Sequence, residues 1–307
     1  MTYPGSATAF SPGSIGNVGP GFDVLGLAVD DIGDRVTVEL TTGAEVPVIV
    51  RGRDAELVPQ ECRRNVSWIA ATAMLRMWGA SRSAIVTIDK GLPLAGGLGG
   101  SAASAVAGAY AAALAMGETP STEQTITAAL EAEATVAGRH LDNIAASVLG
   151  GLTLVRSVDP IDVIALPSPA WSVALVTPHV RVETKAARAM LPQEWDRKSW
   201  TQQMANTAAL VHAFATSDSA LVRRALDDRY AEPLRATLIP HFHDVKRAAV
   251  LAGAFACGIS GSGPTIFAIA ENDEVAKQCA AAMQAAFAEI ASDAHVAPIA
   301  REGVRRA

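Results

Sequence analysis

The sequence predicts an α+β or α/β fold of two domains, and three observations support this prediction. Stretches with strand and helix periodicity alternate through both halves of the 307-residue chain. A glycine-rich loop, Pro93–Ser104, separates a strand-like stretch from a long uncharged helical one. Prolines punctuate the middle of the chain at Pro160, Pro167 and Pro169, which places a boundary between domains of residues 1–165 and 166–307.

In the first domain, periodicity and capping residues indicate the elements. Two strand-like segments flank a Gly/Pro-rich loop within the first forty residues, and the second alternates polar and apolar residues over Arg35–Leu40. Helical spacing follows the N-cap residue Asn65 and ends before Gly79. The remaining predictions are a strand at 84–88, a helix at 101–116, a helix from the capping-box residues Ser121 and Gln124 to about Ala137, a short helix ended by Gly150 and Gly151, and a strand at 152–155.

The second domain continues the alternation of strands and helices. A strand is predicted at 171–176, and a helix follows with one face marked by Trp200, Met204, Ala208, Val211 and Ala215. A second glycine cluster at 258–264 leads into a strand at 265–270. Asn272 then caps a helix that runs to about Ile290, and the last strand is predicted at 295–299.

Composition and charge exclude several classes of protein. Half of the residues are hydrophobic and 18% are charged, so a sizeable core is expected and disorder is not. The net charge is −6 without a basic block, which argues against nucleic-acid and membrane partners. The three cysteines, Cys62, Cys257 and Cys279, have neither disulfide nor zinc spacing, and residues 1–5 do not resemble a signal peptide. We therefore expect a cytoplasmic protein.

The loop Pro93–Ser104 gives the clearest functional signal. Its four glycines let the backbone approach a ligand closely, and the helix that follows points free N–H groups at the same place. Such a site favours a phosphate group. A competing interpretation is a dinucleotide fingerprint, because Gly97–Ala102 fits G-x-G-x-x-G/A with Glu118 at a suitable distance. That motif needs its first glycine directly after the strand, whereas residues 89–96 intervene here.

Three glycine-rich motifs occur in order along the chain, at residues 11–28, 93–104 and 258–265. Together they resemble the three motifs of the GHMP small-molecule kinases. Within that superfamily the first motif resembles the homoserine kinases, as does the stretch His140–Ala146 that precedes Gly150 and Gly151. The residues that carry the first motif are Asn17, Pro20, Gly21, Phe22 and Asp23.

The resemblance implies an α+β fold with an N-terminal ATP-binding domain, a ferredoxin-like C-terminal domain and an active site between them. It also implies a Mg²⁺- and ATP-dependent phosphorylation of the side-chain hydroxyl of L-homoserine, a step of threonine biosynthesis, in a homodimer. Two alternatives stay open. The chain is then either a GHMP kinase for a different small alcohol or a non-catalytic GHMP-fold protein that binds a ligand.

The resemblance further assigns residues to the charged groups of homoserine. Arg188 and Arg235 match the positions at which the family holds the carboxylate, a bidentate task that suits guanidinium groups. Asp23 is expected to bind the ammonium group. Thr184 lies on the same segment as Arg188 and is expected in the same pocket.

The catalytic positions implied by the resemblance are Asn17, Asp23, His140 and Asn143. The two asparagines are expected to orient the hydroxyl group, and His140 is either a phosphate contact or a structural histidine. No Asp–Lys pair is evident as a catalytic base, so the transfer is expected to depend on positioning and charge neutralisation.

Nucleotide binding is expected at Asn65 and along the glycine-rich loop. The loop residues are Pro93, Leu94, Ala95, Gly96, Gly97, Leu98, Gly99, Gly100, Ser101, Ala102, Ala103 and Ser104. Mg²⁺ usually takes one or two protein oxygens, and Ser101 and Glu133 match the family's ligands, with Glu131 as the alternative to Glu133. The family's loop commonly reads Gly-Leu-Gly-Ser-Ser. Gly100 replaces the first of these serines, which removes one side-chain contact to the nucleotide and keeps the backbone N–H groups.

Overall fold

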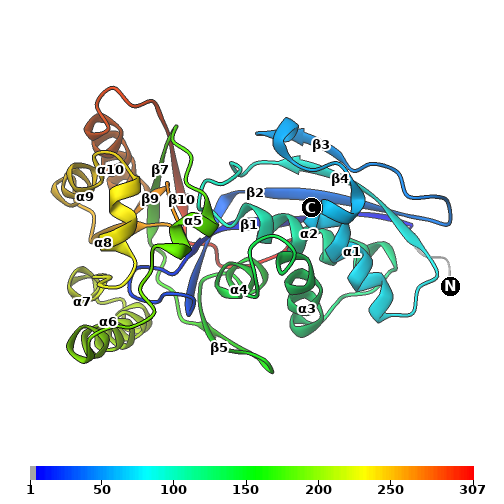
Figure 1. Cartoon of the computed structure of the whole chain (residues 1–307), viewed down its shortest axis with the longest axis horizontal. Helices are drawn as coiled ribbons and strands as arrows, with labels where there is room; N and C mark the ends of the chain where they lie inside the picture. The colour runs from blue at the N-terminus through cyan, green and yellow to red at the C-terminus, as the bar shows by residue number, and fades with distance from the viewer. Residues whose placement is uncertain (1–4) are drawn as a thin grey trace.

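The computed structural model describes residues 5–307, which form two lobes side by side (Figure 1). Most of the N-terminal segment considered above for a signal peptide lies outside these residues. One lobe is built on a seven-stranded sheet and the other on a four-stranded sheet, each covered by helices. The predicted α+β fold is confirmed.

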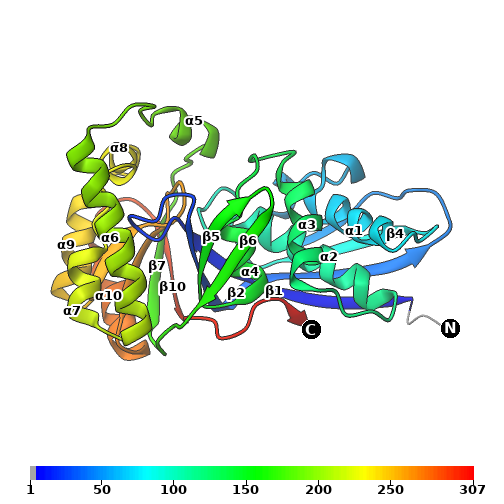
Figure 2. The ribbon, with the colours of Figure 1, turned by 90° about the horizontal axis from the view of Figure 1, so that it is seen from below.

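The seven-stranded sheet has antiparallel neighbours except for one parallel pair, β3 and β4. Its strands are β1 (Ser6–Gly16), β2 (Leu25–Thr41), β3 (Ile49–Gly52), β4 (Ser83–Lys90), β5 (Leu152–Val158), β6 (Ile161–Leu166) and β11 (Arg305–Arg306). β11 pairs with β1, so the end of the chain returns to the first sheet (Figure 2). The division into residues 1–165 and 166–307 stays a prediction.

Within residues 5–307, three helices of this lobe pack on the sheet and a fourth, α3, packs on those helices. They are α1 (Val66–Met77), α2 (Gly100–Ala115), α3 (Thr122–Glu133) and α4 (Asp142–Leu149), and two short 3₁₀ helices, η1 (Ala55–Leu57) and η2 (Cys62–Arg64), precede α1. Asn65 Oδ1 accepts the N–H groups of Ser67 and Trp68 at 3.0 and 3.2 Å. Ser121 and Gln124 form the predicted capping box. α3 ends at Glu133, earlier than the predicted Ala137, and residues 134–137 form turns.

The second lobe contains an antiparallel sheet in the order β10-β7-β9-β8. Its elements are β7 (Ser172–Pro178), α5 (Thr184–Ala189), α6 (Arg197–Thr216), α7 (Ser219–Ala225), α8 (Glu232–Arg235), η3 (Ala236–Leu238), α9 (Phe242–Leu251), β8 (Ala256–Ile259), β9 (Ile266–Ala270), α10 (Asp273–Ala286) and β10 (Ser292–Pro298). In chain order the strands lie fourth, first, third and second, which is the ferredoxin-like arrangement. No helix within residues 5–307 is long and apolar enough to cross a membrane.

Alternate side chains of β7 enter two different cores, as strand geometry requires. Val173 packs on one side of the sheet with Phe214 of α6. Ala174 packs on the other side with Met283 of α10. The first of these cores also contains Ile15 of β1, so a continuous apolar core joins the two lobes.

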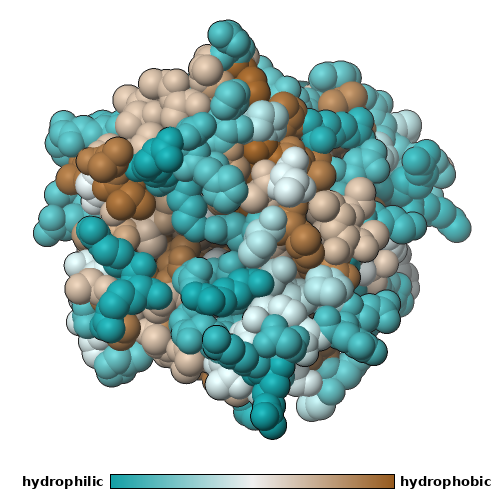
Figure 3. All heavy atoms as spheres, turned by 60° about the vertical axis from the view of Figure 1, so that its left-hand side comes forward, coloured by the Kyte–Doolittle hydropathy of each residue, from teal (hydrophilic) through white to brown (hydrophobic). Residues whose placement is uncertain are grey.

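The face of α6 marked by its apolar residues is not the face that it buries. Trp200 and Met204 are 53% and 49% exposed, whereas the polar residues Gln203 and Asn206 are buried. On this side of the molecule hydrophobic residues are scattered among hydrophilic ones (Figure 3). Buried polar groups are tolerated when they form hydrogen bonds, and those of Gln203 and Asn206 do. Apolar spacing therefore identified the helix but not its buried side.

Candidate active site

A cavity of about 530 Å³ lies between the lobes. The first lobe contributes the loops after β1 and β4 and the start of α4, and the second contributes α5, α8 and the loop between β8 and β9. Every predicted site residue lines this cavity except Leu98 and Ala103, which are buried in the core. A second cavity of about 440 Å³ contains none of the predicted substrate or metal residues.

Glycines in the left-handed conformation shape the loop after β4. Gly97 and Gly99 have φ angles of +81° and +64°. A Cβ atom would lie 2.5 Å from the Ser260 carbonyl oxygen at Gly97, and 2.1 Å from Ser14 Oγ at Gly99. A side chain is therefore excluded at both positions. At Gly100 the nearest atom to an added Cβ is 3.4 Å away, so this position has room for a side chain.

The second glycine cluster fastens this loop from the other lobe. Ser260 Oγ donates a hydrogen bond to the Gly97 carbonyl oxygen at 2.6 Å. The Thr265 N–H group donates to the Gly96 carbonyl oxygen at 3.3 Å. α2 begins at Gly100, and its first residues line the cavity. The first N–H groups of the helix therefore lie next to this loop at the cavity. Backbone donors at a helix start suit a phosphate group.

A buried ion pair between Lys90 and Asp34, which the sequence did not indicate, forms hydrogen bonds to residues at both ends of the loop. Lys90 Nζ binds the Asp34 carboxylate and also donates to the Gly100 carbonyl oxygen at 3.2 Å and to Ser104 Oγ at 3.1 Å. Asp34 accepts the N–H group of Gly91 at 3.1 Å. The pair therefore holds the residues on both sides of the loop. Asp34 and Lys90 belong to different strands, and no sequence motif marks them as neighbours.

Ser101 and Glu133 are in contact at the edge of the loop. Ser101 Oγ donates to Glu133 Oε1 at 2.8 Å, and Glu133 Oε2 is buried with no hydrogen-bond partner within residues 5–307. Burial raises the pKa of Glu133 to about 7. The Ser101 hydrogen bond lowers this pKa, and the Asp142 charge raises it. A free buried carboxylate oxygen beside a hydroxyl fits an oxygen-binding cation. Glu131 instead pairs with Arg76 at 2.5 Å on an exposed surface.

Arg188 and Asp23 bind each other across the cavity. Two guanidinium N–H groups of Arg188 donate to Asp23 Oδ1 and Oδ2 at 2.7 and 2.9 Å, a bidentate pair. The Asp23 hydrogen bond raises the pKa of Arg188. His140 Nδ1 lies 3.6 Å from Asp23 Oδ2, and burial lowers the pKa of His140, so it is neutral at pH 7. Thr184 Oγ1 lies 3.2 Å from Ser262 Oγ at the same end of the cavity.

Arg235 is buried and has no counter-ion within residues 5–307. The residue is 3% exposed, its Nη1 donates to the Gly261 carbonyl oxygen at 2.8 Å, and its Nε has no hydrogen-bond partner among the described residues. Burial lowers the pKa of Arg235, and the charge of Arg188 lowers it further. The guanidinium carbons of Arg188 and Arg235 lie 5.1 and 5.3 Å from the centre of the Phe22 ring. Two cations over one ring, one of them unpaired, form a site for an anion.

Asn17 and Asn143 lie on either side of Asp142. The Asn17 N–H group donates to Asp142 Oδ2 at 3.1 Å, and its side-chain amide donates to the Gly261 carbonyl oxygen at 3.0 Å. Asn143 Oδ1 accepts the Ser14 hydroxyl at 2.9 Å. Burial raises the pKa of Asp142 to about 6. Asp142 falls within the stretch that carries the family resemblance, but the sequence did not indicate its burial against Asn17.

Comparisons with known proteins identify the family. Two protein-family models match the chain, the GHMP kinases N terminal domain over residues 65–151 and the GHMP kinases C terminal domain over residues 210–289. The fold is that of a GHMP kinase.

Relatives that match nearly the whole chain indicate which branch of the GHMP kinases it belongs to. Homoserine kinases from Chlorobium phaeobacteroides and Chlorobium phaeovibrioides are 38% and 39% identical to the chain, over 98% of this chain and 99% of theirs. A crystal structure of homoserine kinase from Cytophaga hutchinsonii has a TM-score of 0.94 at 38% identity, covering 99% of this chain and 98% of that one. The chain belongs to the homoserine kinase family.

Proposed function

We propose that this protein transfers the γ-phosphoryl group of ATP to the side-chain hydroxyl of L-homoserine, giving O-phospho-L-homoserine and ADP. The observation that carries the proposal is the buried, unpaired guanidinium of Arg235, which lines the same cavity as the glycine-rich loop. A buried charge without a partner is costly, and a substrate carboxylate would supply the partner. Membership of the homoserine kinase family supports the same substrate.

A free amino acid can satisfy Asp23, Arg188 and Arg235 together. Its carboxylate would bind Arg188 and Arg235, and its ammonium group would take over Asp23, which Arg188 binds in the structure. This exchange leaves none of these three side chains unpaired. A neutral sugar would leave Arg235 unpaired, and a hydroxy acid without an ammonium group would leave Asp23 to compete with it for Arg188. The pocket therefore favours homoserine over the other small alcohols considered.

We propose that Asn17 and Asn143 orient the substrate hydroxyl. Its oxygen forms a bond to the γ-phosphorus while the bond from that phosphorus to the bridging oxygen of ADP breaks, and the hydroxyl proton is released. This transition state is loose, so positioning and charge matter more than a strong base. His140, neutral beside Asp23, would help to fix the carboxylate that holds the ammonium group.

The nucleotide is proposed to lie along the loop Pro93–Ser104 and against the start of α1. The Asn65 side chain already caps α1, so its contribution would be to fix that helix. Ser101 and Glu133 would hold Mg²⁺, because Glu133 has a free buried oxygen and Glu131 is paired elsewhere. The ion would neutralise charge on the phosphate groups.

A coupled ADP-release assay with Mg²⁺ and ATP tests the function. Homoserine should give rapid ADP release, whereas mevalonate, shikimate and galactose should give none above background. Preferential turnover of one of the other alcohols would indicate a different GHMP kinase, and ligand binding without ADP release would indicate a non-catalytic protein. We also expect a cytoplasmic homodimer. Light scattering on the purified protein measures its oligomeric state.

A further inference from the structure

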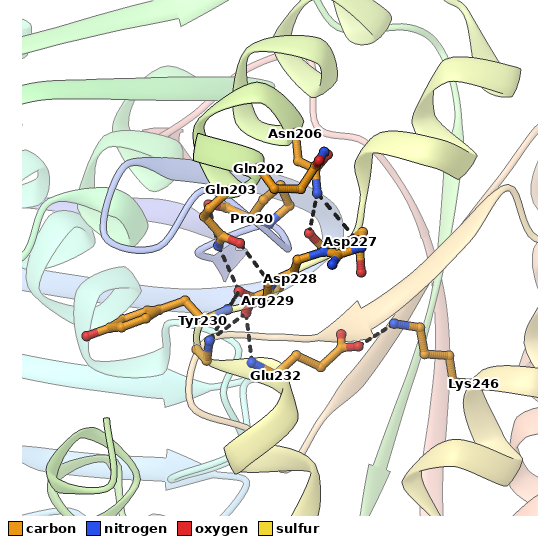
Figure 4. Close-up of polar contacts among 11 residues, drawn as sticks. Pro20, Gln202, Gln203, Asn206, Asp227, Asp228, Arg229, Tyr230, Glu232 and Lys246 are labelled. Carbon is orange, nitrogen blue, oxygen red and sulfur yellow. Dashed lines mark hydrogen bonds and ion pairs between the residues drawn. The ribbon is translucent and has the colours of Figure 1, made fainter. Parts of the chain in front are cut away.

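We propose that Asp228 and Gln203 are positioning residues for the substrate carboxylate. Neither lines the active-site cavity. They connect α8, which carries Arg235, to the loop after β1, which carries Phe22 and Asp23 (Figure 4). The inference rests on the proposed function, because it assigns these residues a task in binding homoserine.

The Asp228 carboxylate holds the start of α8. It is 8% exposed and accepts the N–H groups of Tyr230, Ala231 and Glu232 at 2.8, 3.1 and 2.8 Å. α8 has only four residues, so its own hydrogen bonds cannot fix its direction. Because Arg235 is the last residue of this short helix, its backbone position depends on the Asp228 carboxylate.

The Gln203 side chain joins three segments through one amide group. Its Nε2 donates to Asp228 Oδ1 at 2.8 Å and to the Pro20 carbonyl oxygen at 3.0 Å, and its Oε1 accepts the Arg229 N–H group at 2.8 Å. Thr207, one turn further along α6, donates to the same Pro20 carbonyl oxygen at 2.9 Å. α6 thus fixes the loop after β1 and the start of α8 relative to each other.

The two connected segments meet again at the unpaired guanidinium. The Phe22 ring, two residues after Pro20, lies 5.3 Å from the guanidinium carbon of Arg235 and packs edge-on against Tyr230 at 5.1 Å. A shift of either segment would change the distance between Arg235 and the Asp23–Arg188 pair. Arg235 is buried, so solvent would not compensate for a misplaced charge. The network therefore sets the spacing between the carboxylate and ammonium sites.

The test compares two variants with two matched controls. Gln203→Leu removes the Gln203 hydrogen bonds to Pro20, Asp228 and Arg229. It leaves the Thr207 hydrogen bond to Pro20 and the Asp228 contacts with α8 in place. Its control is Gln284→Leu on α10, which removes a hydrogen bond of 2.9 Å to the Ser292 carbonyl oxygen away from the cavity. Asp228→Asn alters the contacts at the start of α8. Its control is Asp218→Asn, which alters the N-cap of α7.

The readouts are the KM for homoserine, the KM for ATP, and the ratio of kcat/KM for homoserine to that for L-homoserine amide, which keeps the hydroxyl and ammonium groups but has a neutral amide in place of the carboxylate. In both test variants the homoserine KM should rise roughly tenfold to a hundredfold, the usual effect of slight misplacement, and the ratio should fall equally. The KM for ATP should stay unchanged, and the controls should behave as wild type.

Other outcomes would overturn the inference in distinguishable ways. If kcat falls equally for homoserine and its amide with an unchanged KM, the network serves only stability and the inference is wrong. If Asp228→Asn does not fold, Gln203→Leu decides by itself, and a wild-type ratio in that variant overturns the inference. If the wild-type protein does not distinguish homoserine from its amide, the proposed function fails and this inference fails with it.

Discussion

Replacement of Arg235 by leucine removes the guanidinium on which the proposed substrate depends. The side chain is 3% exposed, and its Nε group has no partner within the described part of the chain. Most of its hydrogen-bonding capacity is therefore available to a ligand. We expect Arg235→Leu to lose affinity for homoserine and to retain its affinity for ATP.

The size of the loss follows from burial. Removing one partner of a buried, hydrogen-bonded charge pair costs about 2–5 kcal/mol. At about 1.4 kcal/mol per factor of ten, this loss corresponds to an increase in the homoserine KM of between about thirtyfold and a few thousandfold. The Arg188 side chain is 38% exposed and already paired with Asp23, so Arg188→Leu should cost less, because solvent screens it. The two losses should not add, since both residues hold one carboxylate.

Stability provides a control for this prediction. Arg235 has no counter-ion in the part of the chain that the structure describes, and a buried charge of this kind destabilises the free protein, so Arg235→Leu should not lower the Tm. The measurements are the homoserine KM, the ATP Kd by calorimetry and the Tm by thermal denaturation. An unchanged homoserine KM would refute the carboxylate assignment. A lower Tm together with lost ATP binding would show that Arg235 is a structural residue.

Three further predictions concern the loop, the ammonium site and the metal site. Gly99→Val should abolish ATP binding in calorimetry because its side chain would collide with Ser14. Gly100→Ser should bind ATP as wild type does. Normal ATP binding by the valine variant would show that the loop has only a structural role. Asp23→Asn should raise the homoserine KM and keep the acidic limb of the pH–rate profile, and loss of that limb at an unchanged KM would identify a general base. The raised pKa of Glu133, about 7, means that a proton competes with Mg²⁺ below that pH. The Mg²⁺ concentration for half-maximal activity should therefore rise as the pH falls from about 8 to about 6, and it should rise more in wild type than in Glu133→Gln, where protonation of ATP remains. Equal pH dependence in both would contradict the assignment.

Local sequence signals predicted the parts of the structure that depend on near neighbours. Asn65 and Ser121 cap their helices through N–H groups two or three residues away, so their patterns are visible in the sequence. The glycines at 97 and 99 adopt left-handed conformations that glycine favours. The family resemblance then indicated which distant motifs would share one cavity.

Contacts between distant polar residues could not be predicted in this way. Gln203 and Asp228 are buried because each satisfies the hydrogen bonds of the other and of nearby backbone groups, and nothing in either residue's local sequence indicates the partner. Lys90 and Asp34 are buried for the same reason. Apolar periodicity placed Trp200 on the marked face of its helix, although Trp200 is exposed and the buried face includes Gln203.

The identity of the product tests the proposed function most directly. Purified protein with Mg²⁺ and ATP would be incubated in parallel with L-homoserine and with L-homoserine amide, and the products followed by phosphorus NMR. We predict a phosphate ester on the homoserine side chain, formed in equal amount to ADP, and almost no ester from the amide, which keeps the hydroxyl group but has no carboxylate to engage Arg188 and Arg235. Equal ester formation from both compounds, or ADP release without a new ester, would contradict the proposal.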